Sequence, residues 1–153
     1  MSRAFVKNLD DTVEALPDRP ISSHPNLVTP EGLAHIEAEV ARLQQEHAAA
    51  HAAGDRTALA RAARDLRYWT VRRASAQLAP APSDRSEVHF GATVTIVRDD
   101  GRRQTFRIVG EDEADPAHGT VSHVSPLARA LFGKQVGDTV EVARSQAEIV
   151  EIA

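Results

Sequence analysis

The chain has 153 residues, of which 42% are hydrophobic and 26% are charged. This composition is typical of soluble globular proteins and excludes wholesale disorder. The absence of cysteine excludes disulfides, thiolate zinc sites and cysteine nucleophiles. A formal net charge of −4 argues against a protein that holds duplex nucleic acid, because that mode needs a basic face to neutralise phosphates. Any link to nucleic acid is therefore expected to be indirect.

The apolar runs of the chain are short. They fall below the roughly 18 residues needed to span a bilayer, and residues 1–7 lack the apolar region of a signal peptide. We therefore expect a cytoplasmic protein with no membrane partner.

Residues 1–28 show neither a helical nor a strand period. Pro17, Pro20 and Pro25 interrupt them, and proline-rich polar stretches resist regular structure. This segment is predicted to be a flexible tail.

Helix signals begin together at residue 29. Thr29 is suited to cap a helix, Pro30 to occupy its first turn, and Glu31 to complement the positive end of the dipole. Apolar residues then recur at alternating spacings of three and four, the seam of a heptad pattern. The seam residues are Leu33, Ile36, Val40, Leu43 and His47.

A second helical stretch follows Gly54 and Asp55, with the same alternation. Two stretches of nearly equal length joined by a short glycine turn predict an antiparallel helical hairpin over residues 29–79. The first arm is acidic and the second basic, so flanking charges can pair across the hairpin. The second seam comprises Leu59, Ala62, Leu66, Trp69, Arg73 and Ala76.

Prolines at 80 and 82 end the helix and predict a linker over residues 80–87. The remaining domain, residues 88–153, is rich in β-branched residues, with a turn signal at Asp99-Asp100-Gly101. Ser125 and Pro126 predict the start of a short helix. We expect strands at 88–97, 104–109, 121–124, 139–142 and 147–152, forming a four- or five-stranded antiparallel sheet with one helix. The predicted fold class is α+β.

Several segments of this domain resemble the C-terminal domain of the Gre transcript-cleavage factors, the GreA/GreB family. They are Phe90–Val94, Phe106–Asp115, Ser125–Leu131 and Val136–Asp138, in the family's order. Val28–Leu33 is similar to the start of the Gre coiled coil, and Gly54–Arg56 resembles its tip. The likeness covers about residues 27–152.

The resemblance implies a regulator of transcription elongation that is not itself an enzyme. It implies a coiled coil inserted into the secondary channel of RNA polymerase and an FKBP-like domain docked on the channel rim. The protein then needs no cofactor of its own, because the polymerase holds the magnesium. We expect it to be a monomer. The resemblance also implies polymerase contacts by Ser122, Ser125, Pro126, Leu127 and Arg129.

The tip departs from the family pattern. Family members follow Gly-Asp with Ser-Glu-Asn-Ala, and the Asp and Glu help to hold a second magnesium ion in the polymerase active site. Asp55 matches the acid, but Ala58 stands where the Glu is expected and offers no oxygen to a cation that requires oxygen ligands. Both arms are also shorter than the family norm by about two turns of roughly 5.4 Å each. These departures favour a channel binder that modulates elongation or competes with other binders, with or without stimulation of RNA cleavage by the polymerase.

Each candidate site has a structural interpretation beside the functional one. Asp55 is also a good helix N-cap, and the acidic run from Glu111 to Asp115 can be a solvated loop instead of a cation site. His47 and His51, one turn apart, are expected to pack because no third ligand is evident. Trp69 is expected in the hairpin core, not in a stacking platform with Tyr68.

Two other functions fit the predicted fold. An FKBP-like domain can be a peptidyl-prolyl isomerase, but that activity needs an aromatic-lined pocket, and the domain offers only Phe90, Phe106 and Phe132. A coiled coil can also serve as a structural interaction module that dimerises. The short seam, interrupted by Arg73 and by alanines, favours an intramolecular hairpin.

Overall fold

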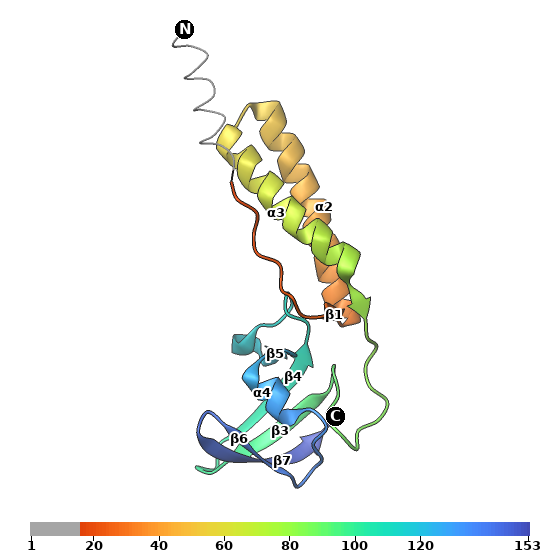
Figure 1. Ribbon diagram of the computed structural model, residues 1–153, viewed down its shortest axis with the longest axis vertical. Helices are drawn as coiled ribbons and strands as arrows, with labels where there is room; N and C mark the ends of the chain where they lie inside the picture. Colours follow the sequence, from red (N-terminus) through yellow and green to blue (C-terminus); the bar gives the residue numbers. More distant parts are fainter. Residues whose placement is uncertain (1–15) are drawn as a thin grey trace. The chain divides into compact units, whose positions relative to one another are not determined.

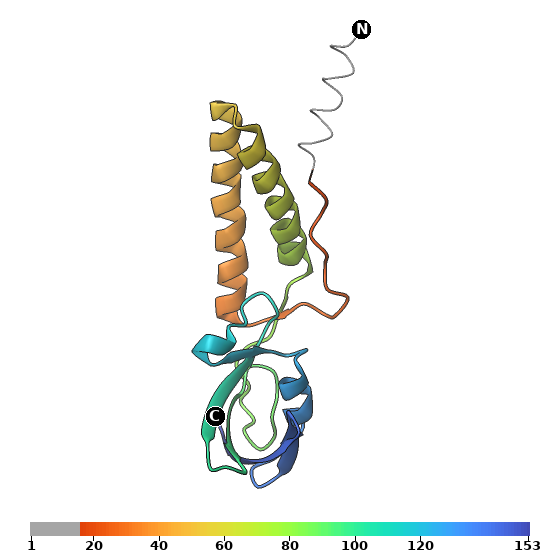
Figure 2. The same cartoon turned by 90° about the vertical axis from the view of Figure 1, so that its left-hand side faces the viewer.

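A computed structural model describes residues 16–153 and divides the chain into two compact units. The hairpin unit comprises His35–Ser75 with the described residues up to Ser23, and the β unit comprises His24–Ala34 with Ala76–Ala153. Figures 1 and 2 show a pair of helices and a curled sheet. The α+β class is confirmed. Within the described residues, no helix combines the length and apolarity required to cross a bilayer.

The predicted helical hairpin is confirmed. Helix α2 covers Pro30–Ala53 and helix α3 covers Arg56–Ser75, with 24 and 20 residues. At 1.5 Å per residue the two helices are about 36 and 30 Å long. They run antiparallel, as both views show (Figures 1 and 2).

The hairpin core follows the predicted seam of α2 closely and that of α3 in part. Ile36, Val40 and Leu43 are buried in α2, and Ala62 is buried in α3. The prediction fails near the end of α3, where Arg73 is exposed and Arg72 is 2% exposed. Residues 72 and 73 lie three and four positions beyond Trp69. The heptad alternation predicted that residue 73 would be buried, but both residues lie about one helical turn beyond Trp69, and the structure buries residue 72.

The β unit contains a curled sheet of five strands in the order β5-β4-β3-β7-β6. Four strands pair antiparallel as predicted, but β5 runs parallel to β4, so the purely antiparallel sheet was wrong at this edge. Parallel neighbours need a crossover, which the ten residues between these strands, including the 3₁₀ turn η1 at Pro116–His118, provide. The strands are β3 (Thr93–Arg98), β4 (Arg103–Val109), β5 (Thr120–Ser122), β6 (Thr139–Val142) and β7 (Ser145–Ile152).

A two-stranded parallel sheet, which the sequence did not predict, closes the base of the hairpin. Strand β1 (Leu27–Val28) pairs with strand β2 (Gln77–Leu78). The backbone N–H of Gln77 donates to the carbonyl of Asn26 at 2.8 Å, and that of Ala79 to Val28 at 2.9 Å. Two-residue strands carry no period, so no sequence pattern reveals them.

The sheet and helix α4 (Pro126–Leu131) enclose the core of the β unit. Ile96, Ile108, Ile149 and Leu131 are fully buried there. Leu127 and three phenylalanines, Phe90, Phe106 and Phe132, pack against this cluster. The phenylalanine rings of the β unit therefore contribute to its core.

The predicted domain boundaries, and the flexibility of residues 1–28 and of the linker 80–87, stay predictions. Residues 1–15 lie outside the described part of the chain. In the hairpin unit, residues 16–23 have no regular secondary structure, and Asp18 and Arg19 make side-chain contacts with α3.

Replacing Ile149 by alanine should lower the free energy of unfolding of the β unit by about 2–5 kcal/mol, because it removes a fully buried side chain and leaves a cavity. The matched control is Val136→Ala, since Val136 is 55% exposed and its loss should cost about 0.5 kcal/mol or less. Denaturant titration followed by circular dichroism checks both. Equal effects of the two substitutions would show that the core is misassigned.

Candidate functional site

The tip of the hairpin is a tight turn closed by backbone hydrogen bonds. The N–H of Gly54 donates to the carbonyl of His51 at 3.2 Å, and that of Asp55 to Ala50 at 3.0 Å. Gly54 has φ +65°, the left-handed conformation that favours glycine after the last turn of a helix. The tip therefore presents Asp55 directly after the turn.

Asp55 caps helix α3. Its Oδ1 accepts the backbone N–H of Ala58 at 3.1 Å, and its carbonyl accepts the N–H of Leu59 at 2.9 Å. This is the expected geometry of an aspartate N-cap, so the structural interpretation of Asp55 is satisfied. Its side chain is nevertheless exposed, and its role as a tip acid stays a prediction.

The chemistry available at the tip is limited to one carboxylate. The methyl group of Ala58 has no ligand atom, and a hard cation such as magnesium requires several oxygens. Within residues 16–153, no cluster of three or more His, Cys, Asp or Glu side chains is arranged to hold a metal ion.

The two histidines near the tip differ in their surroundings. His47 is half-buried and lines a cavity of the hairpin unit, whereas His51 is exposed and accepts the Gly54 N–H through its carbonyl. Trp69 is also half-buried and meets His35 edge to face, with ring centroids 5.5 Å apart. The half-buried positions of His47 and Trp69 agree with the expected packing, whereas the expectation that His51 packs was wrong, because His51 lies in the last turn of α2 and is exposed.

In the β unit, the predicted polymerase contacts come together around the start of α4. Ser125 is the N-cap of this helix, and its Oγ accepts the Ala128 N–H at 3.2 Å, with Pro126 in the first turn. The Ser125 N–H donates in turn to the carbonyl of Ser122 at 2.9 Å, which ties the end of β5 to the helix start. The predicted cap is therefore present.

The outward side of this segment is available to a partner. Pro126 and Arg129 are exposed, while Ser122, Ser125 and Leu127 are half-buried. Arg129 adds a cation to this group of residues. Contact of this surface with polymerase stays a prediction.

Glu113 is a residue whose role the sequence did not reveal, because it lies in the acidic run expected to be solvated. Its Oε2 accepts the backbone N–H of Thr29 at 3.1 Å and that of Gly110 at 3.2 Å. Its Oε1 accepts the Thr29 hydroxyl at 2.5 Å, and Thr29 Oγ1 accepts the Gly32 N–H at 3.0 Å. Glu113 therefore fixes the first turn of α2 within the β unit.

Two glycines make room for this contact. A Cβ on Gly32 would lie 2.0 Å from Glu113 Oε2, and one on Gly110 would lie 2.5 Å from the Leu27 carbonyl oxygen. Glycine in the first turn of a helix carries a propensity cost, which the close approach of Glu113 explains. The one sequence signal for this close approach was Gly32 itself, a glycine in the first turn of a helix with otherwise strong start signals.

Glu31 lies beside this contact and pairs with Arg107 at 3.4 Å. Its own backbone N–H and then the Arg107 guanidinium hold the pKa of Glu31 below its ordinary value of 4.5. A carboxylate whose pKa is lower in the folded chain stabilises the fold above the unfolded value, and this contribution is lost as the pH falls through the lowered pKa. The pair is exposed, so its contribution to holding the helix start is small; it is present above about pH 4.5, the ordinary pKa of the group, and is lost at more acidic pH.

Comparison with known proteins identifies the class. The family model described as "Transcription elongation factor, GreA/GreB, C-term" matches residues 82–153. Transcription elongation factor GreA of Rhodospirillum rubrum is 34% identical over 137 residues, covering 75% of this chain and 86% of that protein. The chain belongs to the GreA/GreB family, which confirms the resemblance.

Other relatives match over a shorter length. GreA of Hyphomonas neptunium is 59% identical over 59 residues, and GreA of Methylobacterium nodulans is 58% identical over 59 residues. The match covers 38% of this chain in each case, and the chain spans only 38% and 37% of these two relatives. A solved GreA/GreB factor from Nitrosomonas europaea has a TM-score of 0.42 at 17% identity, covering 84% of this chain and 98% of that chain. That score is too low to support a further conclusion.

Replacing Glu113 by alanine should lower the free energy of unfolding by about 2 kcal/mol, because two backbone N–H groups and the Thr29 hydroxyl lose a charged acceptor. Denaturant titration measures this change in the free energy of unfolding, with the exposed Glu141→Ala as control.

Gly32→Ala should destabilise the wild type but be neutral or stabilising in the Glu113→Ala background, since the clash is removed and alanine favours the helix. Additive effects of the two substitutions would contradict this contact.

Proposed function

We propose that this protein regulates transcription elongation by binding bacterial RNA polymerase in the cytoplasm, and that it does not stimulate transcript cleavage. The hairpin enters the secondary channel and the β unit docks on the rim. Membership of the GreA/GreB family supports the partner. The single observation that carries the proposal is the tip, where Asp55 caps α3 and Ala58 supplies no second carboxylate.

Stimulated cleavage would require the tip to supply oxygen ligands to a second metal ion in the polymerase active site. A lone carboxylate leaves most of the coordination shell to water and polymerase groups. The Oδ1 of Asp55 already accepts the Ala58 N–H, which leaves chiefly Oδ2 to a cation. Arms of 24 and 20 residues, shorter than the family pattern, further reduce how far the tip can reach. The hairpin then acts by occupying the channel and by excluding other channel ligands.

The remaining parts of the proposal follow from this role. The protein has no catalytic step and no cofactor of its own, because the polymerase holds the magnesium. It acts as a monomer, with the surface from Ser122 to Arg129 contacting the rim. That surface combines exposed Pro126, half-buried Leu127 and the cation of Arg129, a mixture suited to protein contact.

With stalled, backtracked elongation complexes in magnesium, the wild-type protein should bind without shortening the RNA 3′ end. Asp55→Ala should bind similarly after allowance for the lost cap, which costs about 1 kcal/mol of hairpin stability. Binding is followed by fluorescence anisotropy and RNA length by gel electrophoresis. Shortening by the wild type that disappears in Asp55→Ala would make this a cleavage factor, and absence of binding would refute the proposed partner.

The matched variant is Ala58→Glu, which restores the missing carboxylate at an accessible position of the same turn. It should gain cleavage activity in the same assay if the arms reach the catalytic metal. Ala58→Gln has nearly the same shape without the charge and serves as its control.

A further inference from the structure

A segment before β1 lies along α3 within the hairpin unit, as both views show (Figures 1 and 2). We name residues 16–21 the strap. Arg67 holds it at two points: Nε donates to Asp18 Oδ1 at 2.5 Å, and Nη2 donates to the Leu16 carbonyl at 3.3 Å. Arg19 adds an ion pair with Asp65 at 3.5 Å and lies 3.9 Å from the ring centroid of Tyr68.

These contacts are replaceable because they are exposed. In the pair between Arg67 and Asp18 the two side chains remain 49% and 74% exposed. Exposed ion pairs contribute little to stability and are screened by salt. Another carboxylate brought to Arg67 can therefore displace that of Asp18.

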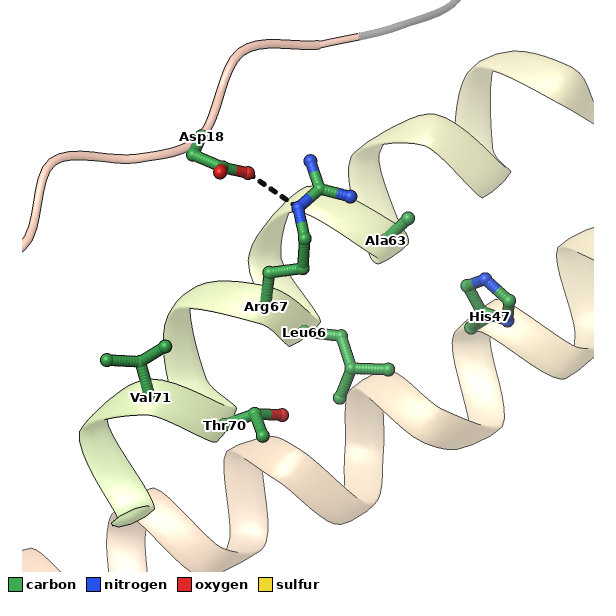
Figure 3. A pocket seen from close by; sticks show the side chains of 7 residues that line it. All are labelled: Asp18, His47, Ala63, Leu66, Arg67, Thr70 and Val71. Atoms are coloured by element: carbon green, nitrogen blue, oxygen red, sulfur yellow. Dashed lines mark hydrogen bonds and ion pairs between the residues drawn. The ribbon is translucent and has the colours of Figure 1, made fainter. Parts of the chain in front are cut away.

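The strap also leaves space unfilled beside α3. A cavity of about 500 Å³ lies there, and Ala63, Leu66 and Val71 supply its apolar lining, with Arg67 and Asp18 also facing it (Figure 3). A mainly apolar lining with a few polar groups is typical of binding sites. Val71 remains 45% exposed, so the strap covers this surface incompletely.

The charge of α3 defines what the surface accepts. The helix carries six arginines and one aspartate, which attracts an acidic partner. The strap also indicates the shape of the partner, since the strap is an extended, proline-containing segment that presents a carboxylate to Arg67. The apolar side chains beside Arg67 favour a peptide over a phosphate backbone, because phosphates offer no apolar contact.

We propose that the face of α3 formed by Leu66, Arg67 and Val71 is a docking surface for an extended acidic peptide segment of RNA polymerase. In the free protein the strap occupies this surface as an intramolecular competitor. The inference rests on the proposed function for the identity of the partner. Competition lowers the apparent affinity by the fraction of molecules in which the strap is bound.

The test is a titration of core RNA polymerase, free of nucleic acid, with the full-length protein and its variants. Asp18→Ala should bind about two- to five-fold more tightly, because the exposed ion pair that retains the strap is lost. Arg67→Ala should bind about ten-fold more weakly, because it removes a charged donor to the partner. The double variant should match Arg67→Ala. Opposite signs for two residues that bond to each other cannot arise from a purely structural ion pair, whose loss acts in one direction.

Matched controls are Arg61→Ala, on the same helix outside the cavity lining, and Glu37→Ala, an exposed acid of α2. Both should bind within two-fold of the wild type on the scale of exposed substitutions, roughly 0.5 kcal/mol. Circular dichroism confirms that each variant folds. If Asp18→Ala and Arg67→Ala change affinity in the same direction, or not at all, the docking surface is refuted while the proposed function stands.

Two further outcomes are distinct. Lack of binding by every form, wild type included, refutes the proposed function and with it the polymerase as the source of the peptide. An Arg67 effect that occurs only with an RNA–DNA scaffold present would indicate a phosphate contact and refute the peptide.

Discussion

The hydrogen bonds that the Glu113 carboxylate accepts from Thr29 determine where the helical hairpin begins. They join residues 84 positions apart and draw the first turn of α2 into the β unit. The Gly32 backbone lies close to the Glu113 carboxylate and the Gly110 backbone lies close to the Leu27 carbonyl, so neither position has room for a side chain. Together with the pairing of β1 and β2, these contacts tie the segments that precede α2 and follow α3 to each other within the β unit.

The tip and the flank of the hairpin carry opposite chemistry. At the tip, a single carboxylate caps α3 through one of its oxygens, and the neighbouring Ala58 supplies no second carboxylate. Along α3 the arginines remain, and one of them is held by the chain's own strap. These features underlie the proposals that the hairpin binds polymerase without promoting cleavage and that the strap regulates this binding. The two features are independent, since no residue is shared between the tip turn and the strap contacts.

The sequence predicted those features that depend on local patterns. The helix start at Thr29, the turn at Gly54, the cap at Ser125 and the seam of α2 all follow from residue type and spacing, and the structure has each of them. What it could not predict depends on distant partners. The parallel pairing of β5 follows from the path of a ten-residue crossover, and Glu113 looks like a solvated acid until Thr29 is placed beside it. The strap was read as a tail because its contacts with α3 join residues about fifty positions apart.

Site-specific crosslinking is the most direct test of whether the tip enters the polymerase secondary channel without serving as a metal ligand. A photoreactive amino acid at Thr57, an exposed residue of the tip turn, is activated in a complex with stalled polymerase, and the crosslinked peptide is identified by mass spectrometry. We expect crosslinks to the channel wall that persist when magnesium is removed. Crosslinks elsewhere on the polymerase surface, or crosslinks near the catalytic centre that depend on magnesium and on Asp55, would contradict this expectation.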